Sequence, residues 1–310
     1  MKKVVNNVLY QKKGVTISHV ASSLLSRRVG DRIPSISEYQ QEFGVSRGTM
    51  QNALSYLKEI DAIQLSSRGH MGTYIEKIDY VKLQDSTLVQ ELMGIMPLPY
   101  SRTYEGLATA VYEQLKDYRF NMAYARGAVG RIKLVETGTY QFAICSQYAA
   151  EYAIENGKNI EIVQNFGDGS FVSQHVLVLR DSKADGIQDG MRVAYDCDSL
   201  DQGELTKRLI KGKKVKLVDI RTQLTLAALD EGIIDAGIWN YDDILETKSF
   251  EGLHIVTLNK PDYSSEFATA VIVIQKGNAY LKEVLDKNIS KRYTLTVLEE
   301  VRKQKRRPSY

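Results

Sequence analysis

The first quarter of the chain places its apolar side chains first at the period of a helix and then at that of a strand. Residues 36–43 have helical spacing, and Ser35 and Glu38 form the sequence of a capping box at their start. A second helix begins after Ser46, which can cap it. Its apolar stripe consists of Met50, Ala53, Leu54 and Leu57. Because Gly44 is placed to end the first of these helices, the pattern predicts a helix-turn-helix.

The flanking segments complete a small domain. The apolar positions of a third helix lie upstream, at Ile17, Val20, Ala21, Leu24 and Leu25. Downstream, residues 63–65 and 73–75 have the composition of short strands around the polar loop 66–72. A hairpin after a helix-turn-helix predicts an α+β winged helix-turn-helix over residues 1–78.

The second predicted helix has one polar, uncrowded face beside its N-terminus. That face carries Arg47, Gly48, Gln51, Asn52 and Ser55. Free N–H groups and the positive end of the helix dipole attract phosphate, and short side chains allow close approach to base edges. The pattern therefore predicts a partner in double-stranded DNA; the alternative is a small helical domain without a nucleic-acid partner.

The segments GDRIPS, FGVSRGT, ALSYL and RGHMGT, in this order, resemble the winged-helix domain of the GntR family of bacterial transcription regulators. Carried over by position, the resemblance implies DNA contacts from Arg47, Thr49, Arg68, Gly69 and His70, with Ser35 and Ser46 as caps that face phosphate. We add Gln51 and Asn52 from the polar face. Ser37 and Gln51 stand where many members have arginine, so the operator of typical members is not assumed.

The distribution of charge supports a nucleic-acid partner. Residues 1–80 hold 11 Lys or Arg against 7 Asp or Glu, and residues 299–310 hold 5 against 2, whereas the segment between them holds 25 against 29. The basic excess is thus at the predicted DNA-reading end and at the tail 301–310, as phosphate contacts require. For the tail itself, a solvated, disordered end is predicted.

Length and composition exclude several classes. A chain of 310 residues with 43% apolar content can form two or more cores. Residues 1–14 do not resemble an export signal, and no apolar run approaches the roughly 18 residues of a membrane span. Cys145 and Cys197 are isolated and the four histidines lack metal-ligand spacing. We therefore expect a cytoplasmic protein without a metal or another cofactor.

After a linker helix over residues 79–93, short strands alternate with amphipathic helices through a domain predicted to span residues 94–300. The predicted strands are 95–98, 120–124, 142–145, 192–195, 215–219 and 236–239, and the predicted helices are 103–115, 129–136, 202–210 and 222–230, with a crossover over 160–179. Residues 136–146, ETGTYQFAICS, correspond to residues 230–240, DEGIIDAGIWN. This repetition predicts two similar α/β lobes with parallel strands and a cleft between them.

The two-lobed pattern resembles the type 2 periplasmic-binding-protein fold, which also senses ligands in LysR-type regulators. Together with the winged helix-turn-helix of residues 1–78, this domain makes the whole chain resemble the YhfZ-type branch of GntR-like regulators. The resemblance implies a sensing role, whereas the βαβ pattern alone would equally permit an enzyme.

Small molecules bind open α/β sheets at the carboxyl ends of their strands, so we expect ligand contacts just past each strand. The candidates are Ser101, Arg102, Thr103, Arg126, Ser146, Ser173, Asp196, Ser199 and Asn240. Ser101 and Thr103 have an alternative role as helix caps. Asp196, Asp198 and Asp201 could suggest a cation site, but they lack the spacing of a calcium loop and a solvated turn is favoured. His175 is predicted to be a hydrogen-bonded hinge residue.

Taken together, the patterns predict a homodimeric transcription regulator whose operator affinity is controlled by a small molecule with a carboxylate or phosphate group. The alternatives are a catalytic or a chorismate-lyase-like C-terminal domain. No nucleophile elbow, phosphate-binding loop or zinc-protease helix is present in the sequence, so we do not expect an enzyme.

Overall fold

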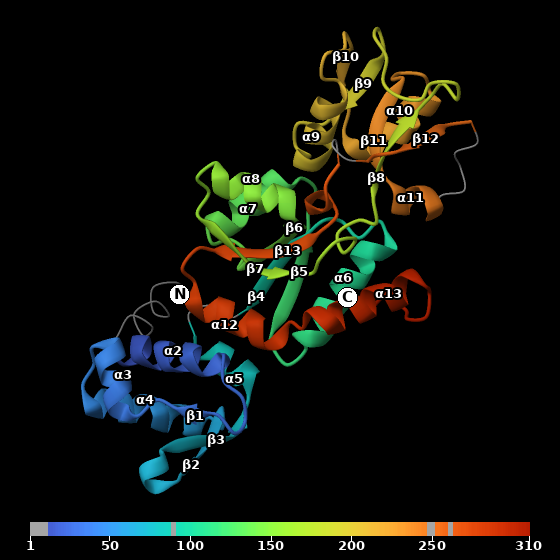
Figure 1. The fold of residues 1–310 in the computed structure, drawn as a ribbon. Coiled ribbons are helices and arrows are strands. Elements are labelled where there is room, and N and C mark those ends of the chain that lie inside the picture. Colours follow the sequence, from blue (N-terminus) through green and yellow to red (C-terminus); the bar gives the residue numbers. More distant parts are fainter. Residues whose placement is uncertain (1–11, 88–90, 247–251, 260–262) are drawn as a thin grey trace, which may run out of the picture. The chain divides into compact units, whose positions relative to one another are not determined.

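The computed structural model describes residues 12–87, 91–246, 252–259 and 263–310. Residues 1–11, which bear on the predicted absence of an export signal, and 88–90 of the predicted linker lie outside this part. The chain forms two compact units. The head unit consists of the residues up to 92 together with 114–121 and 279–288, and the C-terminal unit contains the rest (Figure 1).

The first part of the head unit is a winged helix-turn-helix, as predicted. Its elements are α2 (Lys12–Leu25), β1 (Arg32–Ile33), α3 (Ile36–Phe43), α4 (Arg47–Glu59), β2 (Ile63–Ser67), the 3₁₀ turn η1 (Gly69–Met71) and β3 (Thr73–Ile78). The three strands form one antiparallel sheet in the order β1-β3-β2. The predicted stripes of α2 and α4 are buried around Tyr39, except that Ile17 is half-buried.

Local capping fixes the turn between α3 and α4. The Ser35 hydroxyl accepts the Glu38 N–H, and the Glu38 carboxylate accepts the Ser35 N–H, so the predicted capping box is formed. Gly44 ends α3 with a φ of 63°, in the left-handed region that glycine adopts without steric cost. The Ser46 hydroxyl accepts the Thr49 N–H at 3.3 Å and starts α4.

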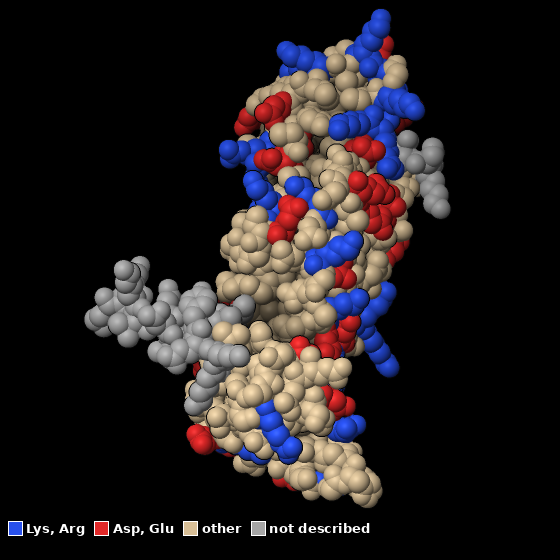
Figure 2. Space-filling model, turned by 90° about the vertical axis from the view of Figure 1, so that its left-hand side faces the viewer, with Lys and Arg blue, Asp and Glu red and all other residues tan. Residues whose placement is uncertain are grey.

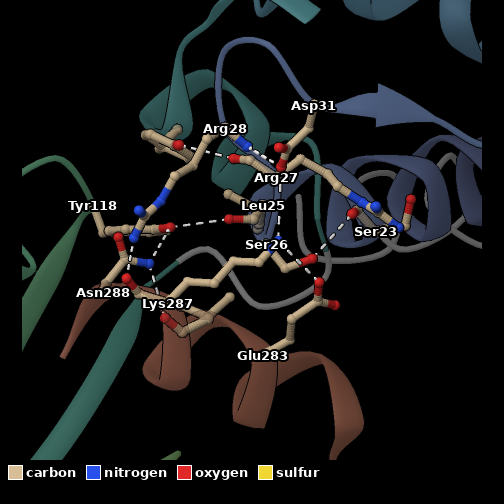
Figure 3. A network of polar contacts seen from close by, with 12 residues as sticks. Ser23, Leu25, Ser26, Arg27, Arg28, Asp31, Tyr118, Glu283, Lys287 and Asn288 are labelled. Atoms are coloured by element: carbon tan, nitrogen blue, oxygen red, sulfur yellow. Dashed lines mark hydrogen bonds and ion pairs between the residues drawn. The ribbon is translucent and has the colours of Figure 1, made fainter. Parts of the chain in front are cut away.

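The head unit extends beyond the predicted boundary at residue 78. It also contains α5 (Tyr80–Asp85), residues 114–121 and α12 (Ala279–Asn288). Tyr118 is the buried centre of this arrangement, because its hydroxyl donates to the Leu25 carbonyl and accepts from the Asn288 amide, both at 2.9 Å (Figure 3). Its ring stacks on that of Tyr80 with the centroids 4.8 Å apart. The C-terminal end of α2 is therefore bonded to segments far along the chain.

Charged groups reinforce the contact between the end of α2 and α12. The Arg28 guanidinium donates to the Lys287 carbonyl, and the Lys287 ammonium lies 3.7 Å from the Asp31 carboxylate (Figure 3). These groups are partly exposed, so the pairing contributes only about 0–1 kcal/mol. The buried Tyr118 hydroxyl is the stronger constraint.

The C-terminal domain contains two five-stranded mixed sheets, which define lobe 1 and lobe 2. Lobe 1 has the strand order β5-β4-β6-β13-β7, with β4 (Leu92–Met96), β5 (Phe120–Tyr124), β6 (Phe142–Ser146), β7 (Ile160–Asn165) and β13 (Ala270–Gln275). Lobe 2 has the order β10-β9-β11-β8-β12, with β8 (His175–Leu179), β9 (Arg192–Tyr195), β10 (Lys216–Asp219), β11 (Ala236–Asn240) and β12 (His254–Thr257).

Helices follow most of the strands. They are α6 (Arg102–Gln114), α7 (Ala128–Glu136), α8 (Gln147–Glu155), α9 (Leu200–Leu209), η2 (Thr222–Leu224), α10 (Thr225–Asp230), α11 (Tyr241–Glu246), η3 (Ser265–Phe267) and α13 (Lys291–Arg302). In lobe 1, α7 and α8 pack on the sheet around Ile132, Val135 and Ala149. Among the helices of the described residues, none has the length and apolar content that crossing a bilayer requires.

The predicted repeat is present, but the prediction of parallel strands was wrong in part. β6 and β11 occupy the centre of their sheets, and each has a parallel neighbour on one side, β4 or β9. The neighbour on the other side is antiparallel, with Ala270 opposite Ser146 in lobe 1 and Asn240 opposite His175 in lobe 2. The reason is that the chain enters lobe 2 through β8 and comes back to lobe 1 through β13. These two strands therefore run antiparallel to the central strands β11 and β6. Two mixed sheets also differ from the single antiparallel sheet expected for a chorismate-lyase-like domain.

The basic tail is mostly exposed, as the sequence predicts, but it is docked on the C-terminal unit and not disordered. Arg306 pairs with Glu113 and with Glu300, both at 2.7 Å, and the Ser309 N–H donates to the Thr109 hydroxyl at 3.0 Å. The tail is therefore docked on α6, and the charge of Arg306 is neutralised within the C-terminal unit.

Candidate functional site

The C-terminal unit has a small cavity, of about 70 Å³, where lobe 1 meets lobe 2, and this cavity is partly open to solvent. Its lining comes from segments at the carboxyl ends of strands in both sheets and from the start of β8. The lining residues are Pro97, Leu98, Tyr100, Tyr104, Arg126, Gly127, Ala128, Arg131, Phe171, His175, Asp196, Asp198, Ser199, Leu200, Asp201, Gln202, Thr222, Gln223 and Asn240. This is the edge at which the sequence analysis expects a ligand.

Four of the nine predicted ligand residues, Arg126, Asp196, Ser199 and Asn240, line the cavity. Arg126 follows β5, Asp196 and Ser199 follow β9, and Asn240 is the last residue of β11. The Asn240 amide donates to the Tyr100 hydroxyl at 3.4 Å, and its own oxygen has no hydrogen-bond partner among the described residues. These four positions line the cavity as expected, and their contact with a ligand stays a prediction.

The other five predicted residues, Ser101, Arg102, Thr103, Ser146 and Ser173, are not among the described residues that line the cavity. The Ser101 and Ser146 hydroxyls are buried, and each accepts an N–H in the first turn of the helix that follows it. Thr103 donates to Asp242 and accepts from Arg302, so its hydroxyl is also occupied. The hydroxyls of Ser101 and Thr103 thus form hydrogen bonds inside the fold. These bonds take the place of the ligand contact that was predicted from the sequence.

Arg126 joins the two lobes across the cavity. Its guanidinium lies 2.9 Å from the Asp198 carboxylate and 3.6 Å from that of Asp196. The next residue, Gly127, has a φ of 76°, and a Cβ there would lie 3.2 Å from the Asp198 carbonyl oxygen. The backbones of the lobes therefore approach closely at a position that favours glycine.

Arg131 lies in the first turns of α7 and is buried, with 3% of its surface exposed. One terminal nitrogen donates to the Ala125 carbonyl at 2.8 Å, whereas Nε has no partner among the described residues. Burial lowers the pKa of this guanidinium. A buried charge that forms no ion pair is costly, so this side chain is a candidate contact for an anionic group.

Asp201 faces the same cavity from the first turn of α9 and is also buried. Its Oδ1 accepts the Ser146 hydroxyl at 2.6 Å, across the two lobes. Burial raises the pKa of Asp201 to about 7, against the opposite effects of the Ser146 hydroxyl and the Arg131 charge. Asp196 is buried as well, accepting the Thr222 N–H at 2.8 Å, so the predicted solvated turn is wrong for two of its three acids.

His175 begins β8 and lines the cavity with 2% of its surface exposed. Burial lowers its pKa to about 3, so the imidazole is neutral at physiological pH. Its Nδ1 has no hydrogen-bond partner among the described residues, whereas the sequence analysis expected a hydrogen-bonded hinge residue. The rings of Tyr100, Tyr104 and Phe171 form an aromatic wall, with neighbouring centroids 5.2–5.3 Å apart.

Arg131 and Asp201 are the two most buried charged side chains of the cavity. Arg131 was not predicted from the sequence, and Asp201 was predicted only as part of a solvated turn. Both follow a predicted strand and lie in the first turns of the helix after it, so the carboxyl-end rule could have included them. The described residues contain no group of three or more His, Cys, Asp or Glu side chains arranged to hold a metal ion.

A second candidate site is on the head unit. Arg47, Gly48, Gln51 and Asn52 are exposed on α4, and Thr49 is half-buried beside its N-cap. At the tip of the wing, Gly69 and His70 are exposed, and the exposed Arg68 guanidinium lies 4.4 Å from the centre of the Tyr74 ring. The predicted polar face is thus formed as expected; its contact with DNA stays a prediction.

On the face of the C-terminal unit that Figure 2 shows, Lys and Arg side chains do not form one continuous basic surface. In the upper part of Figure 2 they are interspersed with Asp and Glu side chains. In the tail, the charges of Lys303 and Arg306 are paired with acidic side chains. Arg47 of α4 and Arg68 of the wing are exposed and therefore accessible to phosphate.

Comparison with known proteins identifies both parts of the chain. Residues 28–75 match a helix-turn-helix domain, and residues 79–310 match the family described as the YhfZ C-terminal domain. The uncharacterized protein YhfZ of Escherichia coli K12 is 29% identical over 301 residues, covering 97% of this chain and 98% of that protein.

Solved structures agree with this assignment. The crystal structure of YhfZ from Shigella flexneri has a TM-score of 0.62 at 27% identity, covering 73% of this chain and 96% of that one. An ancestral arginine-binding protein has a TM-score of 0.51 at 17% identity and covers 69% and 97%, which shows a shared fold alone. The C-terminal part thus has the two-lobed architecture of type 2 periplasmic-binding proteins. With a match over residues 79–310 and a helix-turn-helix domain in front of it, the chain belongs to the YhfZ family.

Proposed function

We propose that the chain is a cytoplasmic, GntR-type transcription regulator without catalytic activity. A homodimer binds a roughly palindromic operator through two copies of α4, about one DNA turn apart. A small molecule with an acidic group binds in the cavity between the lobes and changes the affinity for the operator. That change is no larger than the ligand's differential affinity for the two states of the protein.

The observation that carries this proposal is the exposed polar face of α4 beside the wing. Ser46 caps α4, and the exposed Arg47 is the first residue of the helix. Gly48 has no atom within 4 Å of where a Cβ would lie, so nothing in the protein crowds this end of the helix. A helix N-terminus with a guanidinium and short side chains suits phosphate and base edges in the major groove.

The cavity supports the second half of the proposal. Two guanidinium groups, Arg126 and Arg131, line it, and Nε of the buried Arg131 has no partner among the described residues. Guanidinium groups bind carboxylate and phosphate in a bidentate manner, so an acidic effector fits them.

Selection of genomic fragments bound by the full chain, followed by fluorescence anisotropy on the recovered operator, tests the proposal. Arg47→Ala should weaken operator binding by about 1–3 kcal/mol, because it removes one base or phosphate contact. Lys216→Ala, an exposed change on β10 in the C-terminal unit, is the matched control and should leave affinity unchanged. If no salt-sensitive binding to any duplex is found, or if both variants bind like the parent, the proposal is wrong.

A further inference from the structure

The cavity holds two buried charges of opposite sign that do not neutralise each other. Arg131 of lobe 1 and Asp201 of lobe 2 both line it, and no ion pair within 4 Å joins them in the described part of the chain. Each of the two forms a hydrogen bond with an uncharged group. Arg131 donates to the Ala125 carbonyl, and Asp201 accepts the Ser146 hydroxyl.

Buried charges that form no ion pair are costly, and each of these two groups forms one hydrogen bond with a neutral group instead. Arg126, Asp196 and Asp198 differ from these two groups because they already form ion pairs: Arg126 lies 2.9 Å from Asp198 and 3.6 Å from Asp196. The Asp196 carboxylate also accepts the Thr222 N–H and hydroxyl. An anionic group could therefore form an ion pair with Arg131, and a cationic group could form one with Asp201.

Three further atoms of the lining residues have no hydrogen-bond partner among the described residues. They are Arg126 Nη1, the Asn240 side-chain oxygen, which is an acceptor, and Nδ1 of the buried, neutral His175 ring. The aromatic wall formed by Tyr100, Tyr104 and Phe171 has no charge and suits the rest of a small molecule. The cavity thus has two charged ends and an apolar side.

We propose that the effector is a zwitterion of the amino-acid class, whose carboxylate binds Arg131 and whose ammonium group binds Asp201. This inference rests on the proposed function, since it names the chemical class of the molecule that controls the regulator. It narrows the acidic effector to one that also carries a positive charge.

Thermal-shift and calorimetric titrations of the full chain test the inference. The probes are α-, β- and ω-amino acids at up to 10 mM, each compared with its N-acetyl form, which lacks the positive charge, and its amide, which lacks the negative charge. We expect at least one amino acid to raise the melting temperature, and both blocked forms to bind at least tenfold more weakly. If no amino acid binds, or a blocked form binds equally well, the zwitterion assignment is wrong.

Two isosteric variants locate the contacts. Arg131→Gln and Asp201→Asn should each weaken binding of the amino acid at least tenfold, whereas the exposed changes Arg180→Gln and Asp219→Asn should not. Asp201→Asn keeps an oxygen for the Ser146 hydroxyl, so a folded variant is expected, and its melting curve without ligand checks this. Parent-like binding by folded Arg131→Gln or Asp201→Asn overturns the assignment.

The outcome is separable from that of the proposed function. Amino-acid binding without any DNA binding would refute the regulator and leave the ligand class standing. Operator binding that responds to cell extract but to none of the amino acids would refute the ligand class and leave the regulator proposal standing.

Discussion

Replacing Tyr118 by phenylalanine removes one buried hydroxyl and tests how the head unit is held together. The ring keeps its stacking on Tyr80, so the change isolates the polar contacts. Burial raises the pKa of Tyr118, and the hydroxyl is therefore a donor throughout the usual pH range. It donates to the Leu25 carbonyl and accepts from the Asn288 amide, both at 2.9 Å.

The magnitude follows from what remains unpaired. The Asn288 amide keeps its bond to the Val284 carbonyl at 2.8 Å, so the loss on that side is small. The Leu25 carbonyl loses the donor that pairs it at the buried end of α2, and an unsatisfied buried acceptor costs about 1–3 kcal/mol. We expect Tyr118→Phe to lower the free energy of unfolding of the head unit by about 2 kcal/mol.

Hydrogen exchange measured by mass spectrometry is the appropriate assay, because a chain with two compact units need not unfold in one step. Peptides from α2 and α12 should lose protection, whereas a peptide from β11 in lobe 2 should not change. Tyr152→Phe is the matched control, since Tyr152 is 42% exposed on α8. Unchanged exchange in α2 and α12 of Tyr118→Phe would refute the reasoning.

Two further predictions concern the cap of α3 and the cavity. Ser35→Ala should destabilise the head unit by about 1 kcal/mol in urea unfolding, because it removes the cap of α3. The control Ser55→Ala, at an exposed position, should change stability by less than about 0.5 kcal/mol. Equal effects of the two substitutions would contradict the capping role. Asp201 has a raised pKa of about 7 and is mostly protonated at pH 6, so binding of an ammonium group there should release up to one proton. Calorimetry in buffers of different ionisation enthalpy measures this release, which should vanish in Asp201→Asn; a binding heat that does not depend on the buffer in the parent protein would contradict it.

The winged helix could be predicted closely because its signals are local. The capping box of Ser35 and Glu38 and the left-handed Gly44 each act within a few residues, and the sequence shows them directly. The same is true of the repeated helix–glycine–strand segments that end in β6 and β11. Such signals indicate where an element begins and ends, and they do not depend on distant parts of the chain.

Strand direction and the role of buried charges could not be predicted in this way. The direction of β8 and β13 depends on the two crossings between the lobes, and the periodicity of a buried strand is the same in either direction. Arg131 and Asp201 lie in helices whose sequence is compatible with solvent exposure, and only the meeting of the lobes buries them. Likewise, the docking of Arg306 on Glu113 joins residues 193 positions apart.

The assembly of the head unit from three separate stretches of chain restricts how this protein can be re-engineered. A chimera that transfers only residues 1–78 to another effector domain would leave the Leu25 carbonyl without the Tyr118 hydroxyl, and Asp31 without the Lys287 ammonium. A winged helix-turn-helix transferred in this way would need a recipient protein with an equivalent of Tyr118 and an equivalent of α12. Custom operator specificity is thus better introduced by changing side chains on α4 within the intact protein than by exchanging whole domains.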